Sequence, residues 1–182
     1  MTTISTFAVK RKNDGTIEVN DASITVEFRE GFGIHVSGLD GFPAREILLR
    51  TIKALASSGC IVGNRKISTK FDTDYATTQE RMGVMTELFD FPLAVAIMQE
   101  LGFAKFPNDY RIRYVGMLRP DGRIELLDPR EFDACHQRVF LDSELVCANN
   151  LWKEANIDPG HVYLTTFRRL HNIAATPNPE RP

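Results

Sequence analysis

The chain has 182 residues, of which 43% are apolar and 25% are charged, and its formal net charge is −2. This composition is typical of a water-soluble protein, and the length predicts one domain whose core needs no disulfide or metal to hold it. The small net charge excludes an overall basic field for nucleic acid, although it is compatible with a local basic patch. No segment approaches the roughly 20 apolar residues that span a bilayer, and residues 1–9 lack the apolar run of a signal peptide. A cytoplasmic protein without membrane contact is therefore predicted.

The cysteines and histidines indicate neither a metal nor a cofactor. Cys60, Cys135 and Cys147 are odd in number and widely spaced, and no C-x-x-C pair is present. Zinc knuckles and dithiol redox motifs are therefore not indicated, and three free thiols fit a reducing compartment. The histidines show no metal-ligand spacing either.

The first half of the chain predicts strands and one long helix. Asn13, Asp14 and Gly15 form a hairpin turn signal between two alternating segments. Pro43 favours a helix start because its missing N–H would be unpaired in the first turn anyway, and Gly59 supplies the stop. The predicted strands are 5–10, 17–28, 32–37 and 65–71, and the helix between the last two covers about 43–58.

The second half predicts shorter elements. Residues 72–88 are polar, with a short helix near 79–85, and this loop is expected to be the most mobile element. A helix over 91–101 is expected to be capped by Asp90 and ended by Gly102. Further strands are predicted at 111–118, 123–126, 139–141 and 161–164, and further helices at 129–137, after Ser143 to 155, and after Thr166 to 175. The domain is expected to cover 1–175, and the proline-rich tail 176–182 to be disordered.

Three blocks of sequence resemble one known family. The first is 31–39 (GFGIHVSGL), followed by a helix containing Ala-Arg-Glu. The second is 89–94 (FDFPLA), and the third is 114–118 (YVGML) followed by 121–124 (DGRI). In this order and spacing they are similar to the Lon-like, magnesium-chelatase-like domain that opens ComM-type AAA+ ATPases. The resemblance extends over roughly residues 5–175.

The resemblance implies an α/β fold of the Lon-protease type, which is also the fold of the second domain of a small-subunit ribosomal protein. That fold has two layers, a mixed sheet and a left-handed βαβ unit, whereas about 98% of such crossovers are right-handed. The RadA recombination factor, galactokinase-type kinases and gyrase-type transducers share the fold, so it does not fix a function.

The chemistry that the resemblance would bring is missing. A Lon-type hydrolase needs a serine activated by a lysine. At the serine position this chain has Asp90, Phe91 or Pro92, and the region near Arg130 and Glu131 holds no lysine. Residues 59–66 resemble a P-loop, but the glycine spacing is short and no Ser or Thr follows the lysine, so a helix stop followed by a turn is the better interpretation. No catalytic residue is predicted.

The remaining candidates are surface charges and Asp90. Six cations on predicted strands and turns would bind phosphate or an acidic partner if they shared one edge, and are otherwise ordinary solvated charges. They are Lys66, Lys70, Arg111, Arg113, Arg119 and Arg123. Asp90 is expected to cap its helix, with a role in a ligand pocket as the alternative. Tyr75, Met82 and Met85 in the loop 72–88 are expected either to form a partner surface or to reach back into the core.

Three functions follow as hypotheses. The first is a non-catalytic Lon-like binding or assembly module that oligomerises or docks onto a separately encoded AAA+ ATPase of the magnesium-chelatase or DNA-processing kind. The second is direct binding of DNA or another nucleic acid. The third is a hydrolase of unrecognised type that uses the Asp90 region with the loop 72–88 as a lid.

Overall fold

A mixed four-stranded sheet forms the base of the computed structural model, which describes residues 1–75, 78–107, 109–139 and 141–171. The strands are β1 (Thr2–Arg11), β2 (Ile17–Arg29), β3 (Ile34–Ser37) and β4 (Lys66–Thr73). Their order in the sheet is β1-β2-β4-β3. The β1–β2 and β2–β4 pairs are antiparallel, and the β3–β4 pair is parallel. The mixed α/β class predicted from the sequence is confirmed.

The predicted hairpin joins β1 and β2. The Asp14 carboxylate accepts hydrogen bonds from the Thr16 amide at 2.9 Å and the Thr16 hydroxyl at 2.6 Å, and Gly15 takes the left-handed backbone conformation. Both strands extend beyond their predicted ends, because the pairing runs without interruption from Thr2 opposite Val26 to Arg11 opposite Ile17.

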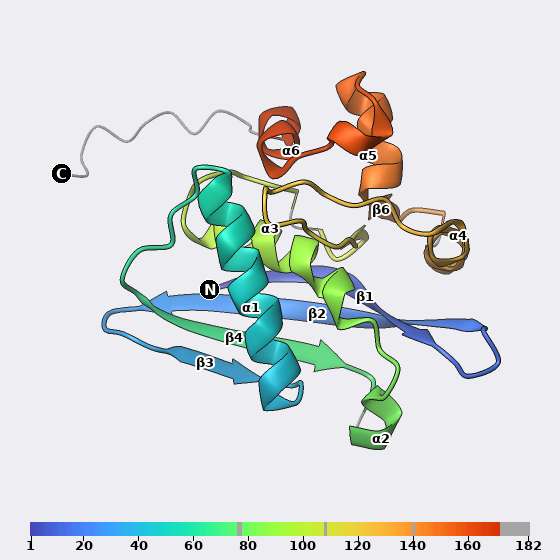
Figure 1. Cartoon of the computed structure of the whole chain (residues 1–182), viewed down its shortest axis with the longest axis horizontal. Coiled ribbons are helices and arrows are strands. Elements are labelled where there is room, and N and C mark those ends of the chain that lie inside the picture. The colour runs from blue at the N-terminus through green and yellow to red at the C-terminus, as the bar shows by residue number, and fades with distance from the viewer. Residues whose placement is uncertain (76–77, 108, 140, 172–182) are drawn as a thin grey trace.

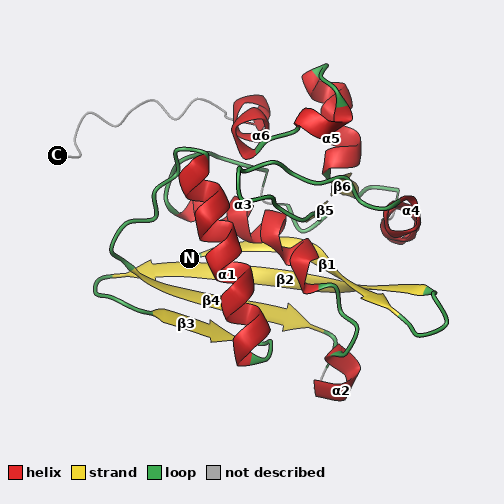
Figure 2. Cartoon of the chain, in the orientation of Figure 1, coloured by secondary structure: helices red, strands yellow, loops and turns green. Residues whose placement is uncertain are grey.

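Two helices cover one face of the sheet, α1 (Gly41–Ser57) and α3 (Asp90–Glu100) (Figure 1). Alternate strand residues point into this layer, as the two-residue period of a strand requires, and Ile4, Ile24 and Phe71 are buried there. On the opposite face, the row Thr3, Thr25 and Lys70 is polar. At this row the sheet has one covered face and one polar face, and Figure 2 shows the helix layer over the covered face. Nearer the hairpin, Phe7 and Val9 on the second face are also buried.

The loop between β4 and α3 lies along the free edge of β1. It contains α2 (Thr78–Arg81) and the 3₁₀ helix η1 (Thr86–Phe89). The Arg11 amide donates to the Gly83 carbonyl at 3.1 Å, and the Met85 amide donates to the Val9 carbonyl at 2.7 Å. One edge of the sheet is therefore closed by the chain itself.

The second half of the chain adds a smaller group of elements beside β1 and β2. They are β5 (Ile112–Tyr114), α4 (Pro129–Arg138), β6 (Glu144–Val146), α5 (Ala148–Ala155), the 3₁₀ helix η2 (Pro159–His161) and α6 (Leu164–His171). β5 and β6 form a parallel pair. A separate apolar cluster joins Phe7 and Val9 of β1 to Cys135, Leu145 and Cys147. No helix in the described residues is both long enough and apolar enough to cross a bilayer.

Several predictions in this half are wrong. The predicted strands 123–126 and 161–164 form only isolated bridges, one of them between Arg123 and Tyr163. Val139 and Leu141 of the predicted strand 139–141 are not in a strand, and residue 140 lies outside the described residues; β5 pairs with 144–146 instead. Ser143 does not cap a helix, since α5 begins at Ala148 after Cys147. Thr166 lies inside α6 rather than at its cap.

Two helix boundaries that were predicted from a local chemical signal are confirmed. Asp128 caps α4 through a capping box with Glu131, and Pro129 occupies the first turn. Gly59, which follows the C-cap of α1, has a φ of +78°. This left-handed conformation stops the helix, as expected for the start of residues 59–66. Residues 172–182, which include the end of the predicted last helix and the predicted tail, lie outside the described residues.

Candidate functional site

Asp90 lies at the position that the resemblance gives to the nucleophile, and it does not cap its helix. Its backbone is already helical, with φ −61° and ψ −49°, because η1 runs directly into α3. Phe89 takes the capping position and makes no side-chain hydrogen bond there. The predicted role of Asp90 as a helix cap is therefore wrong, since a residue inside the helix directs its side chain away from the free amides of the first turn.

The Asp90 carboxylate binds Arg50 of α1 instead. The Arg50 Nη2 atom lies 2.9 Å from Oδ1, and Nε lies 3.2 Å from Oδ2, which is a bidentate pair. None of the Asp90 side chain is exposed, whereas 41% of the Arg50 side chain is. The guanidinium thus closes the carboxylate off from solvent.

Burial and the neighbouring charges set the protonation of Asp90. Burial raises the pKa of the Asp90 carboxyl to about 6, and it outweighs the hydrogen bonds and charge of Arg50, which lower the pKa. A backbone hydrogen bond from Leu118 lowers the pKa further, while the negative charge of Glu87 raises it. The carboxylate is held by Arg50 and Leu118 against a strong cost of burial.

The loop after β5 seals this junction from the other side. The Phe91 amide donates to the Gly116 carbonyl at 3.0 Å, and the Gly116 amide donates to the Leu88 carbonyl at 3.2 Å. A Cβ atom at position 116 would lie 3.3 Å from the Phe91 Cβ, so glycine allows the close approach. The Thr51 hydroxyl also contacts the Asp90 carbonyl oxygen at 3.4 Å.

Surface cavities lie elsewhere on the molecule. Those with volumes of about 440, 620, 290 and 410 Å³ are lined by residues other than Asp90. A fully buried carboxylate that is bound by a guanidinium is poorly placed to contact a substrate. The geometry does not favour the ligand-pocket interpretation of Asp90.

The two predicted lysines lie on β4 and point to the polar face of the sheet. Lys70 forms an ion pair with Asp72, with the Nζ and Oδ1 atoms 2.8 Å apart. Lys66 has no ion pair with any described residue and is exposed.

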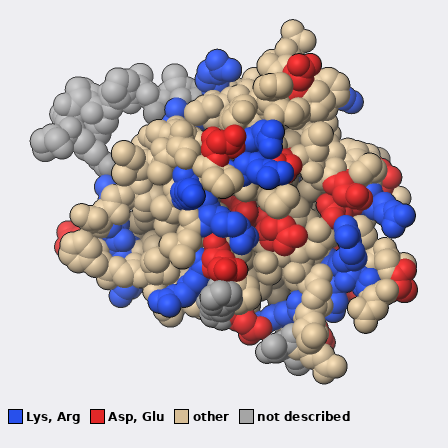
Figure 3. All heavy atoms as spheres, in the orientation of Figure 1, with Lys and Arg blue, Asp and Glu red and all other residues tan. Residues whose placement is uncertain are grey.

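The four predicted arginines are all neutralised by acidic neighbours. The pairs are Arg111–Asp109, Arg113–Asp21, Arg119–Glu125 and Arg123–Glu125. Arg111 and Arg113 lie at β5, whereas Arg119 and Arg123 flank a turn that lies against Ser58, just after the end of α1. The six cations are therefore spread over three places. Figure 3 shows positive and negative side chains intermixed on the face above α1, without a separate basic region.

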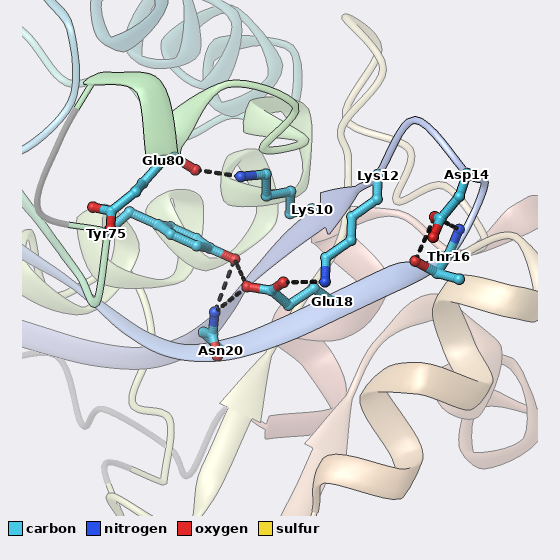
Figure 4. Close-up of polar contacts among 8 residues, drawn as sticks. All are labelled: Lys10, Lys12, Asp14, Thr16, Glu18, Asn20, Tyr75 and Glu80. Atoms are coloured by element: carbon cyan, nitrogen blue, oxygen red, sulfur yellow. Dashed lines mark hydrogen bonds and ion pairs between the residues drawn. The ribbon is translucent and has the colours of Figure 1, made fainter.

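The loop 72–88 is attached to the β1–β2 hairpin by a polar network that the sequence did not indicate (Figure 4). The Tyr75 side chain is buried, and its hydroxyl lies 3.2 Å from Glu18 Oε1 and 2.9 Å from Asn20 Nδ2. Lys12 pairs with Glu18 at 2.8 Å, and Lys10 Nζ donates to the Glu80 carbonyl at 2.7 Å. The alternative that the loop reaches back into the protein holds for Tyr75.

The two methionines of the same loop behave differently. Met85 packs against the apolar cluster around Phe7, whereas 69% of Met82 is exposed. Residues 76 and 77 lie outside the described residues. Of these two methionines, Met82 is therefore the one available for a partner surface.

Arg50 is the functional-site residue that the sequence did not identify. Its place on the polar face of a predicted helix gave the only signal, and forty positions separate it from Asp90. Among the described residues, no group of three or more His, Cys, Asp or Glu side chains could hold a metal ion. No protein-family model and no curated protein sequence matches the chain.

Proposed function

We propose that this chain is a non-catalytic Lon-like module that acts by binding another protein, a separately encoded AAA+ ATPase of the magnesium-chelatase or DNA-processing kind. The observation that carries the proposal is the sealed Arg50–Asp90 pair. It occupies the place where the resemblance would put a nucleophile, and it keeps the Asp90 carboxylate buried against Arg50. A module without accessible chemistry acts through its surface.

The connection between β3 and β4 supports the Lon-like part of the proposal. In Figure 1 both strands point to the same side, α1 lies in front of the sheet, and β4 lies above β3. We take this arrangement as a left-handed crossover, which is the rare hand for parallel strands. The resemblance was the sole reason to expect that hand, so the agreement favours the family over an unrelated α/β sheet.

The other two functions receive less support. Nucleic-acid binding needs cations that are free to replace counterions, and five of the six candidates are already paired with carboxylates. Hydrolysis would require an open route to Asp90, which Arg50 and the 116–118 loop block.

Purification of the tagged protein from its native host at its native level tests the proposal. We expect an AAA+ ATPase in near-equal amount, and the purified pair should elute together in size-exclusion chromatography. The variant Asp90→Asn serves as the matched control, and it should bind the ATPase as the natural chain does, because the carboxylate has no chemical role. Absence of an ATPase partner, or a hydrolytic activity that Asp90→Asn abolishes, would overturn the proposal.

A further inference from the structure

The two edges of the main sheet are treated differently. The edge at β1 is closed by residues 83–85, through the bonds to Arg11 and Val9. The edge at β3 has no strand beside it among the described residues. Natural proteins usually cover or charge such an edge, because its unpaired backbone groups attract another strand. An edge that is left open while the other is closed is a candidate interaction surface.

The register shows which backbone groups are free. The Ile67 amide donates to the Gly33 carbonyl at 3.0 Å, and Ile34 lies opposite Ile67 in the parallel pair. In a parallel ladder this places the N–H and C=O groups of His35 toward β4. The N–H and C=O groups of Ile34 and Val36 therefore point away from the sheet, where an added strand would meet them.

Exposed apolar side chains flank these groups. Phe32 is 81% exposed and Ile34 is 40% exposed. In Figure 1, α1 crosses the sheet near the C-terminal end of β3 and leaves its N-terminal end uncovered. A groove of about 440 Å³ lies at the end of the sheet where β2, the turn before β3 and the start of β4 meet. It is lined by Phe28, Arg29, Glu30, Gly31, Asn64 and Arg65, and Arg29 is paired with Glu27. Apolar groups of this size in solvent favour a partner that covers them.

The charges near this edge include two cations of β4 and its approach, and the carboxylate of Glu30 in the turn before β3. Arg65 and Lys66 lie where β4 begins beside β3, and neither forms an ion pair with any described residue. Lys66 points to the polar face, as His35 of β3 does. Ile34 and Val36 point to the helix face. A strand added here would meet apolar neighbours on one face and cations on the other.

We propose that the free edge of β3 binds an extended segment of a partner protein by strand addition, and that this segment alternates apolar and acidic residues. The inference rests on the proposed function, since it names the surface and the kind of segment through which the module binds its partner. Main-chain hydrogen bonds to Ile34 and Val36 supply the affinity, and the two faces supply the specificity.

A second copy of this chain is a poorer occupant. Two β3 strands paired antiparallel around a two-fold axis would present the same sheet face on the same side. Lys66 of both copies would then lie on one surface, and like charges across an interface oppose association. β3 itself carries no acidic side chain to offset them.

Selection of peptides tests the proposal directly. The purified full chain is used to select binders from a displayed library of random octapeptides, and the affinity of the enriched peptides is measured by fluorescence anisotropy. We expect the enriched sequences to alternate apolar residues with Asp or Glu. Failure to enrich such sequences would overturn the proposal.

Two variants localise the binding. Val36→Pro removes the backbone N–H that points away from the sheet but breaks no β3–β4 hydrogen bond. It should lower the affinity for the peptide by about tenfold. The double change Arg65→Glu and Lys66→Glu keeps the backbone of the strand and should also lower the affinity for the peptide by about tenfold. Ser37→Ala in the same strand and Lys153→Glu on α5 are the matched controls and should leave the affinity unchanged. Peptides that bind both edge variants as tightly as the natural chain would contradict the inference.

The same variants separate this inference from the proposed function. Urea unfolding first establishes that Val36→Pro is folded, and the charge-reversal variant provides the comparison if it is not. An ATPase that co-purifies equally with the natural chain and the edge variants would support the proposed function and overturn the β3 site. A dimer of this chain that Val36→Pro dissociates would also overturn it, because a second copy would then be the occupant. Peptide binding at β3 without any ATPase partner would support the β3 site and overturn the proposed function.

Discussion

Arg50 and Asp90 form one unit, in which each side chain determines how the other behaves. The carboxylate is fully buried and its pKa is raised to about 6 by burial, while the half-exposed guanidinium supplies the compensating charge. A buried ion pair of this kind contributes little net stability, but breaking it leaves an uncompensated charge in the interior. The pair therefore matters mainly for holding α1 against the start of α3.

Replacement of Arg50 by methionine should destabilise the protein by about 2 kcal/mol at pH 8. This is less than the roughly 3–5 kcal/mol for breaking a fully buried pair, because Arg50 is half exposed. The folded chain holds the Asp90 proton to a higher pH than the unfolded chain, so the free energy of unfolding falls as pH rises from about 4 to 6. Loss of Arg50 raises that pKa further. Urea unfolding should therefore show a larger loss in the free energy of unfolding of Arg50→Met, relative to the natural chain, at pH 8 than at pH 5.

The control for this prediction is the double variant Arg50→Met with Asp90→Asn. It has no buried carboxylate, so its deficit should be small and should not change between pH 5 and pH 8. An equal deficit of Arg50→Met at both pH values would contradict the prediction.

Gly38 provides a second prediction at the scale of one residue. Its φ is +88°, and a Cβ atom there would lie 1.7 Å from the Phe71 carbonyl oxygen. Gly38→Ala must therefore displace the backbone of β4, and we expect a loss of more than about 3 kcal/mol in the free energy of unfolding. Gly31→Ala is the control: its φ is +102° but no atom lies within 4 Å of a Cβ. It should cost only about 1 kcal/mol, and similar losses for both variants would show that the contact with Phe71 is unimportant.

The loop 72–88 shows how an irregular element is held by a few contacts. Gly83 and Met85 bond to the edge of β1, and Tyr75 inserts between Glu18 and Asn20 of β2. The loop thus closes one sheet edge and anchors α2 beside the hairpin. The contrast with the uncovered β3 edge is what makes β3 a candidate surface.

Removal of the Tyr75 hydroxyl should loosen this loop without unfolding the sheet. Tyr75→Phe keeps the ring but loses the hydrogen bonds to Glu18 and Asn20, and it should lower the free energy of unfolding by about 1 kcal/mol. Hydrogen exchange should become faster at the amides of Val84 and Met85 before it changes in β2. Tyr110→Phe is the control, since Tyr110 is 77% exposed. Unchanged exchange in Tyr75→Phe would show that the backbone bonds alone hold the loop.

At the scale of the molecule, helices cover one face of the sheet and a smaller group of elements packs at the β1–β2 end. Charged side chains are mostly paired where they occur, so the surface facing the viewer in Figure 3 is electrostatically mixed. Such a surface favours selective contact with one protein over general attraction to a polyanion.

Binding to DNA should therefore be weak. The paired arginines would have to exchange a carboxylate for a phosphate, so we expect an affinity for a duplex of about 30 base pairs that is weaker than about 10⁻⁴ M at physiological salt. Fluorescence anisotropy over a range of salt concentrations measures this. A steep fall in affinity with salt, reduced by Arg113→Ala or Arg123→Ala, would instead support a nucleic-acid function.

The sequence alone determined the elements whose causes are local. Asp14 and Gly15 specify the first hairpin, Asp128 and Glu131 specify the start of α4, and alternating apolar residues specify the strands of the main sheet, because turns, caps and two-residue periodicity act over a few positions. Tertiary structure decided the rest. The Arg50–Asp90 pair joins residues forty positions apart, and the strand at 144–146 forms because β5 lies beside it. Packing in three dimensions also leaves β3 without a neighbouring strand among the described residues, since a neighbour at a sheet edge is a property of the assembled layers and not of any segment.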